Sequence, residues 1–219
     1  MNHNLFSVGL YKTKLNLNVN NIVKYLKNLK KKDSGRNISN PKNMGWQSND
    51  IDAVIFSSSG TVTPSLKKDD FVELQEQLKP HLLEYMNTMS LCGIAKMGSM
   101  WANINSYKDY NEVHTHGGTQ ISCVYYVKTP ENCGEIFFEN PFNTIDISWA
   151  NCKKTFTPYT ASKILMNVEE NDLFIFPGCL AHGVKPNLNK TKDRVSIAFN
   201  ILIELKNYLL ILIRIKHKA

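Results

Sequence analysis

The chain has 219 residues, with 26 Lys and Arg against 19 Asp and Glu, and a formal net charge of +7. Its composition, 42% hydrophobic and 21% charged, is that of a globular protein and excludes a wholly disordered chain, a collagen or a coiled coil. No run of about 20 apolar residues occurs, so we expect no conventional membrane span. The five cysteines show no CxxC spacing and the first residues show no signal peptide, so we expect reduced thiols in a cytoplasmic protein.

The excess of positive charge is concentrated in two short segments. Five lysines lie between Lys24 and Lys32, and the last residues add Arg214, Lys216 and Lys218. Without these eight residues the chain is close to neutral. A charge run of this kind usually forms a solvated face of a helix, and we rank nucleic-acid binding well below that interpretation.

The first part of the sequence predicts helices and a polar loop. Residues 1–32 are typical of a short strand followed by a helix, and residues 67–89 predict a longer helix that is kinked or divided at Pro80. Residues 33–50 are rich in Gly, Asn and Ser and predict a loop. Trp46 is expected to pack this loop onto the body of the protein. A lid over a binding site is the alternative for the loop.

From residue 95 the hydrophobic period changes to two, which is typical of strands. Helices followed by many short strands predict a mostly β fold, a β-sandwich or jelly-roll with helices packed outside. We expect residues 1–219 to form one domain, with N-terminal support in 1–94, a jelly-roll core in 95–205 and a tail in 206–219. Seven segments show the strand pattern: MWANINSY, NEVHTH, ISCVYYV, GEIFFEN, KILMNV, DLFIFPG and RVSIAFNILIEL.

Three of the six histidines have the spacing of a metal site. His114 and His116 lie at i and i+2 at the end of one predicted strand, so both side chains leave the same face. His182 comes much later, just after a strand that ends in a Pro-Gly turn. Imidazole binds divalent iron, zinc and copper. A lone histidine is more often an ordinary core or surface residue, but this combination of three points to a metal inside a jelly-roll.

A second pair of polar residues lies on the last predicted strand. Alternation along RVSIAFNI places Arg194, Ser196 and Asn200 on one face and the large apolar residues on the other. A guanidinium beside a hydroxyl suits a carboxylate, because arginine offers a planar fork of donors. Taken alone, this pair is better explained as two solvent-facing residues on an edge strand.

Together these residues resemble a known superfamily, the iron(II)/2-oxoglutarate-dependent oxygenases, and more closely the 2OG-Fe(II) oxygenases of marine bacteria and cyanophages. Each matching segment is weak by itself, but the combination covers most of residues 45–200 and is specific. The segments are GWQSND at 45–50, MWANIN at 100–105, HTHGGTQISCVYYVKTPENCGEIFFENP at 114–141, FIFPGCLAHGVKPN at 174–187 and DRVSIAFN at 193–200.

The resemblance implies a double-stranded β-helix with helices flanking its N-terminal side, and it implies iron(II), 2-oxoglutarate and dioxygen as cofactor and cosubstrates. His114 matches the first iron ligand and His182 the distal ligand. Arg194 matches the residue that pairs with the far carboxylate of 2-oxoglutarate, and Ser196 matches the hydroxyl of the same motif. Tyr126 resembles a tyrosine that reaches 2-oxoglutarate in some relatives, although alternation alone leaves open which face of its strand is inward.

Further expectations follow from the same resemblance. The enzyme is expected to hydroxylate an unidentified substrate, a small molecule or a protein side chain, while 2-oxoglutarate becomes succinate and CO2. Its location would be the host cytoplasm if a phage encodes it. Asn103 and Asn105, with Trp101 beside them, are candidates for the inner wall and for contacts to the cosubstrate, and hydrogen bonding within the sheet explains the two asparagines equally well.

One departure from the superfamily pattern leaves the third iron ligand open. Relatives usually have His-x-Asp or His-x-Glu, which completes two histidines with a carboxylate, whereas this chain has His116 in the carboxylate position. His116 as the third ligand is the preferred interpretation. In a second interpretation His116 is the first ligand and Gly118 takes the carboxylate position, as in iron halogenases. In the third, Glu112 supplies the carboxylate.

Two other classes of function compete with the oxygenase. A non-catalytic, cupin-like protein that binds a metal or small ligand would keep the three histidines and make Arg194 structural. A basic interaction protein would act through Lys24–Lys32, but the run contains only Tyr25 as an interleaved aromatic residue, so this class ranks last.

Overall fold

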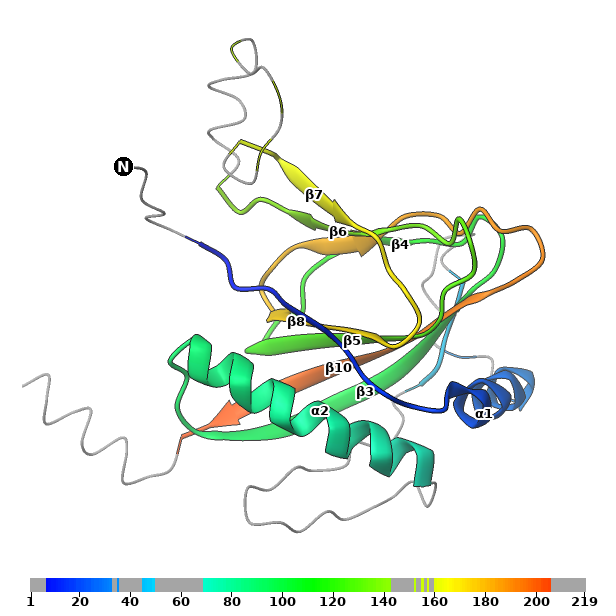
Figure 1. The fold of residues 1–219 in the computed structure, drawn as a ribbon, viewed down its shortest axis with the longest axis horizontal. Helices are drawn as coiled ribbons and strands as arrows, with labels where there is room; N and C mark the ends of the chain where they lie inside the picture. The colour runs from blue at the N-terminus through cyan, green and yellow to red at the C-terminus, as the bar shows by residue number, and fades with distance from the viewer. Residues whose placement is uncertain are drawn as a thin grey trace, which may run out of the picture.

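The computed structural model describes residues 7–32, 35, 45–49, 69–142, 152, 155, 157 and 160–205. Two antiparallel sheets face each other, and two helices cover the outer face of the larger sheet (Figure 1). This arrangement confirms the predicted mostly β jelly-roll with flanking helices. The predicted tail at 206–219 and most of the 33–50 loop lie outside the described residues, and the division of the chain at 94 and 205 stays a prediction.

The strands of each sheet come from distant parts of the sequence. After β3 the chain passes repeatedly from one sheet to the other, as the chain of a jelly-roll does. The large sheet has the order β1-β8-β5-β10-β3-β2 and the small sheet the order β4-β9-β6-β7. The strands are β1 Tyr11–Lys14, β2 Trp46–Gln47, β3 Ile94–Asn105, β4 Asn111–His114, β5 Ile121–Lys128, β6 Ile136–Glu139, β7 Lys163–Met166, β8 Asp172–Pro177, β9 His182–Val184 and β10 Arg194–Glu204.

The two faces of the large sheet have different chemistry. Along β10, Val195, Ile197 and Phe199 point outward into the main hydrophobic core beneath the helices. Arg194 and Ser196 alternate with them and are also buried, so they face the space between the two sheets. The period-two pattern thus separates an apolar face, which holds the fold together, from a polar face that is available for a site.

Two helices supply the rest of the main core. They are α1, Val19–Lys32, and α2, Asp69–Thr88. The second is one uninterrupted helix that contains Pro80, so the predicted division of this helix at Pro80 is wrong. Trp46 is 5% exposed and belongs to the same core, so it packs against the body as expected. His81 of α2 bonds through Nδ1 to the hydroxyl of Tyr11 at 2.9 Å, whereas His3 and His217 lie outside the described residues.

Because α2 seals the core, shortening a buried side chain on it should destabilise the protein. Leu78 is fully buried, and we expect Leu78→Ala to lower the free energy of unfolding by about 3 kcal/mol, since it leaves a cavity. Leu83 lies on the opposite, solvent side of the same helix and is 50% exposed. Leu83→Ala should change the free energy by less than about 0.5 kcal/mol. Urea unfolding measures both, and equal losses would contradict this packing.

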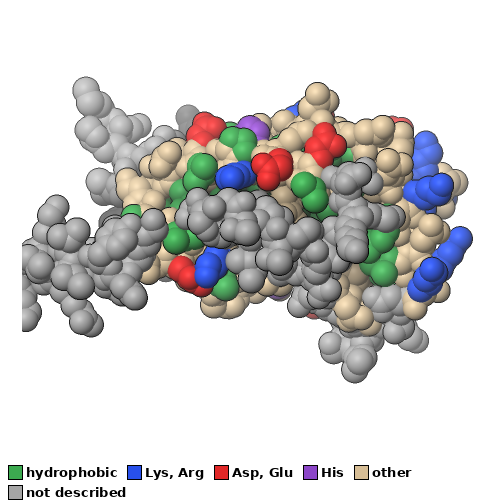
Figure 2. Space-filling view, turned by 90° about the horizontal axis from the view of Figure 1, so that it is seen from below, with side chains coloured by type: hydrophobic (Ala, Val, Ile, Leu, Met, Phe, Trp, Pro, Cys, Tyr) green, Lys and Arg blue, Asp and Glu red, His purple; other side chains and the backbone are tan. Residues whose placement is uncertain are grey.

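The lysine run of α1 lies mostly on its exposed side. Lys24, Lys27, Lys31 and Lys32 are exposed, while Ile22 and Leu26 on the other side are buried. Figure 2 shows Lys and Arg side chains gathered at the end of the helix-covered face where α1 lies. Within the described residues, neither helix is long and apolar enough to cross a membrane.

Candidate active site

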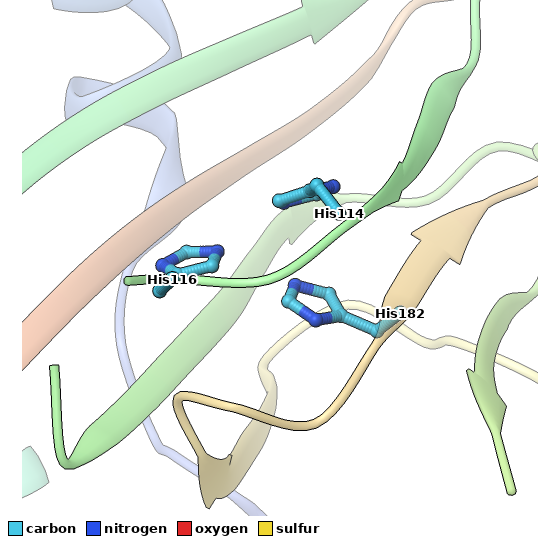
Figure 3. Close-up of side chains that lie close together, drawn as sticks. All are labelled: His114, His116 and His182. Atoms are coloured by element: carbon cyan, nitrogen blue, oxygen red, sulfur yellow. The ribbon is translucent and has the colours of Figure 1, made fainter. Parts of the chain in front are cut away.

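Three histidines meet between the two sheets. His114 ends β4 and His182 begins β9, and the two residues face each other directly in the pairing of these strands. His116 follows two residues after His114. The imidazole centroids are 4.4 Å apart for His114 and His182, and 5.1 Å apart for His116 and each of the other two. The three rings point toward one another (Figure 3).

The ligand atoms of these rings are close enough to share one ion. One nitrogen from each lies within 4.8 Å of the others, and the described part of the chain adds no carboxylate to this group. Protein-bound transition metals are held by imidazole nitrogens at about 2.0–2.1 Å. Three nitrogens gathered in this way could hold one metal ion, and the remaining positions of that metal would be open to other ligands.

The hydrogen bonds of the rings set which nitrogen is available. Nδ1 of His114 donates to the carbonyl of Glu112 at 2.7 Å, and Nδ1 of His182 donates to the carbonyl of Leu180 at 2.8 Å. Because a carbonyl only accepts, each Nδ1 carries the proton and each Nε2 keeps its lone pair. Metal-binding histidines show this pattern, in which the second ring nitrogen fixes the orientation of the ligand.

Burial keeps two of these imidazoles neutral. It lowers the pKa of His182 to about 3, with help from the nearby His114, and it also lowers the pKa of His116. A protonated imidazole has no lone pair for a metal, so a lowered pKa favours metal binding near neutral pH. The three histidines therefore fit a divalent iron ion in number, spacing and protonation.

The cavity beside the histidines is small and partly polar. It has a volume of about 40 Å³, which suits an ion and a few water molecules at about 10–15 Å³ each. A five-carbon dicarboxylate needs more room, so its binding requires side chains of the wall to shift. Besides the three histidines, three of the predicted residues line the cavity: Trp101, Asn103 and Ser196.

Arg194 and Tyr126 are buried between the sheets and do not line this cavity. Arg194 is 1% exposed, and its Nη1 donates to the carbonyls of Cys133 and Lys185. Its Nη2 is buried without a hydrogen-bond partner, as is the hydroxyl of Tyr126. Burial raises the pKa of Tyr126, so the phenol keeps its proton and can donate. Unpaired buried donors are costly, and a carboxylate placed here would pair with both.

The strand register explains why these groups gather. Ser196 of β10 lies opposite Asn103 of β3 on one side and opposite Tyr126 of β5 on the other. Side chains directly opposite one another share a face of the sheet. Tyr126 belongs to the apolar cluster between the sheets, which settles that its face of β5 is the inner one.

The remaining predicted residues have other positions. Asn105 lies opposite Arg194 in the strand pairing, and its carbonyl accepts a bond from Asn187 at 2.9 Å. Glu112 is exposed and is no member of the histidine group, and Gly118 lies in an exposed turn.

Sequence reasoning missed Gln47 and Asn111, which also line the cavity. It also missed the bond between Nδ1 of His116 and Oδ1 of Asn200 at 2.5 Å. For Asn200 the signal was present, since alternation placed it on the face of Arg194.

Comparison with known proteins agrees with this geometry. Residues 99–200, which are 102 of the 219 residues, match the model of a family described as "Putative 2OG-Fe(II) oxygenase". No curated protein sequence matches the chain.

Similar solved structures include three prolyl hydroxylases. A prolyl-4-hydroxylase from Pseudomonas putida has 10% identity and a TM-score of 0.55, and the match covers 90% of this chain and 94% of the hydroxylase chain. A prolyl hydroxylase from Trichoplax adhaerens, in complex with a hypoxia inducible factor peptide, has 12% identity, a TM-score of 0.58 and coverages of 90% and 84%. The collagen prolyl hydroxylase of Paramecium Bursaria Chlorella virus-1, a 2OG complex, has 12% identity, a TM-score of 0.54 and coverages of 88% and 94%. At these identities the likeness shows the fold.

The family match, the jelly-roll and the histidine group agree with one another. The match includes Asn103, His114, His182 and Arg194. Residues 99–200 therefore match the 2OG-Fe(II) oxygenase family, and this match together with the histidine group indicates an oxidoreductase that uses iron(II), 2-oxoglutarate and dioxygen.

Proposed function

We propose that this oxygenase hydroxylates its substrate, so that a C–H bond becomes C–OH while 2-oxoglutarate and O2 become succinate and CO2. One observation supports this proposal above all: three imidazole nitrogens converge on the same side of the sheet as a buried arginine with an unpaired Nη2. A purely structural arginine usually has its buried donors paired. A cupin-like protein that only binds a metal gives no reason for that unpaired group.

His114, His116 and His182 would hold the iron. The bound metal and 2-oxoglutarate supply the oxidising chemistry, and the protein supplies orientation and a dry cavity. Arg194 and Ser196 would bind the far carboxylate of 2-oxoglutarate, with Tyr126 as a further donor. Asn103 and Asn105 lie on the strand beside this group, and the Oδ1 of Asn103 is buried without a partner, so Asn103 can accept a bond from a water or substrate at the cavity.

The geometry favours a ligand set of three histidines over one of two histidines and a carboxylate. Nε2 of His116 is buried and has no partner, as expected for a nitrogen that awaits a metal. In the alternative with His116 and Gly118, the converging ring of His114 would have no role. In the alternative with Glu112, an exposed carboxylate that accepts a bond from the hydroxyl of Tyr110 at 3.4 Å would have to turn inward.

Anaerobic titration tests the proposal directly. Purified protein with iron(II) and 2-oxoglutarate should show the weak visible charge-transfer band of the chelate. Admission of air should then release succinate, slowly without the true substrate. Metal binding with neither the band nor succinate would instead support the cupin-like binding protein.

Removal of the Tyr126 hydroxyl should have opposite effects on stability and on cosubstrate binding. Tyr126→Phe deletes a buried unpaired hydroxyl, so the ligand-free protein should melt at the same or a higher temperature. It also deletes a proposed donor to 2-oxoglutarate, so the KM for 2-oxoglutarate should rise about tenfold. Thermal melting and succinate formation measure the two effects.

The neighbouring residue provides a matched control. The hydroxyl of Tyr125 lies on the other face of β5 and bonds to Asn171 Oδ1. Tyr125→Phe should lower the melting temperature and leave the KM for 2-oxoglutarate unchanged. The role given to Tyr126 is wrong if both variants change the KM equally.

A further inference from the structure

We propose that Asn200 is a positioning residue that holds His116 in the Nδ1–H form, so that its Nε2 completes the three-histidine site. This inference rests on the proposed function of the histidines. It assigns a role to a side chain that does not itself reach the metal position.

His116 needs such a partner because it lies outside the strands. His114 and His182 are each oriented by a carbonyl two residues earlier in the chain. His116 instead follows the end of β4, and its Nδ1 bonds to the Oδ1 of Asn200, which lies 84 residues later on β10. The ring also stacks on Trp101, with centroids 5.5 Å apart and planes 30° apart. Trp101 therefore packs against one face of the His116 ring, and the rotation of the ring on that face depends on the bond to Asn200.

The amide of Asn200 is itself held by the strands on either side. Asn200 lies directly opposite Ser99 of β3 and directly opposite Ser122 of β5. Its Nδ2 donates to Ser99 Oγ at 3.0 Å, and its Oδ1 receives a weaker contact from Ser122 Oγ at 3.5 Å. Because Nδ2 faces Ser99, Oδ1 faces His116. An oxygen only accepts, so the proton of the imidazole lies on Nδ1 and the lone pair on Nε2.

The neutral amide has a chemical consequence. A carboxylate beside a metal-bound histidine raises the basicity of that ligand, whereas an amide orients the ring without adding charge. The bond also ties the third histidine to β10, the strand that carries Arg194 and Ser196. One strand thus sets the position of the metal ligand and of the proposed cosubstrate groups.

The tautomer of His116 tests the proposal without any metal. Long-range proton–nitrogen NMR spectra of the metal-free protein identify the protonated ring nitrogen, and His116→Gln assigns the signal. We expect Nδ1–H in the unaltered protein and a shift toward Nε2–H, the form that free imidazole side chains prefer in water, in Asn200→Ala. Observation of Nε2–H in the unaltered protein, or of the same tautomer in both proteins, would overturn the proposal.

Cobalt(II) titration tests the consequence for the ligand set. Asn200→Ala should weaken cobalt(II) binding by about 10- to 100-fold and alter the visible spectrum of the bound cobalt. Asn200→Asp keeps an acceptor in the same place and should restore binding to the unaltered level or above it. If Asn200 acted in packing alone, Asn200→Asp should not restore binding, because the new carboxylate would bury a charge.

Two further variants separate the possible failures. Ser99→Ala frees the amide of Asn200 to rotate and should weaken cobalt(II) binding several-fold, less than Asn200→Ala does. This variant takes the place of Asn200→Ala if that protein does not fold. Asn87→Ala on the exposed side of α2 should change neither the tautomer nor the affinity. If the unaltered protein binds no cobalt(II), the proposed function fails. If it binds and Asn200→Ala binds equally well, the role of Asn200 alone fails.

Discussion

Replacement of His182 with alanine is expected to abolish turnover and to weaken metal binding by more than about 100-fold. Loss of a residue that only supports a metal ligand costs up to about 100-fold in affinity, and loss of a ligand itself should cost more. His182 is buried at the start of β9, and its ring lies 4.4 Å from that of His114 and 5.1 Å from that of His116. Without it, two histidines remain at one strand end, and the proposed ion would lose its ligand from β9.

Iron(II) or cobalt(II) titration and succinate formation measure this loss. The ring of His182 also packs against Phe176 at 4.6 Å, so far-UV circular dichroism must show that the variant is folded. His81→Ala provides the control, because it removes an imidazole that bonds to Tyr11 on the helix side of the protein. If His182→Ala keeps the metal affinity of the unaltered protein, the assignment of the site is wrong.

The second large effect is expected from Arg194→Ala, which should raise the KM for 2-oxoglutarate by about 100-fold to several thousand-fold. Loss of one partner of a buried ion pair leaves the other charge uncompensated, at about 3–5 kcal/mol, and about 1.4 kcal/mol corresponds to a factor of ten in affinity. Metal affinity should change little, since the guanidinium contacts the carbonyls of Cys133 and Lys185 rather than a histidine.

For this role to hold, Arg194→Ala must raise the KM for 2-oxoglutarate while it leaves the metal affinity nearly unchanged. Succinate formation at increasing 2-oxoglutarate gives the KM, and cobalt(II) titration gives the metal affinity. Arg194→Lys keeps the charge but loses the planar fork, so its KM should lie between those of the unaltered protein and Arg194→Ala. Equal losses of metal and 2-oxoglutarate binding in Arg194→Ala would mean that the arginine supports the structure rather than the cosubstrate.

Much of this site follows from local pattern. Alternation along β10 was sufficient to place Arg194 and Ser196 on one face. The spacing of His114 and His116 predicted that both rings leave one side of the chain, and the two rings do meet, although β4 ends at His114 and His116 lies beyond the strand. Two local expectations were wrong: the helix is not divided at Pro80, and Arg194 and Ser196 are buried on a central strand rather than solvent-facing on an edge strand. Pro80 lies within an uninterrupted α2, because packing of the buried face of this helix outweighs the local penalty of proline.

The sequence by itself determined the period of each strand, the residue types on each face, and the set of histidines and arginine from which the site is built. Only the tertiary structure decided which face of β5 is inward, that His114 and His182 face each other, and that Asn200 reaches His116. The reason is physical. A strand has two equivalent faces until a second sheet covers one of them, and a hydrogen bond between residues 84 positions apart exists only after the barrel has closed.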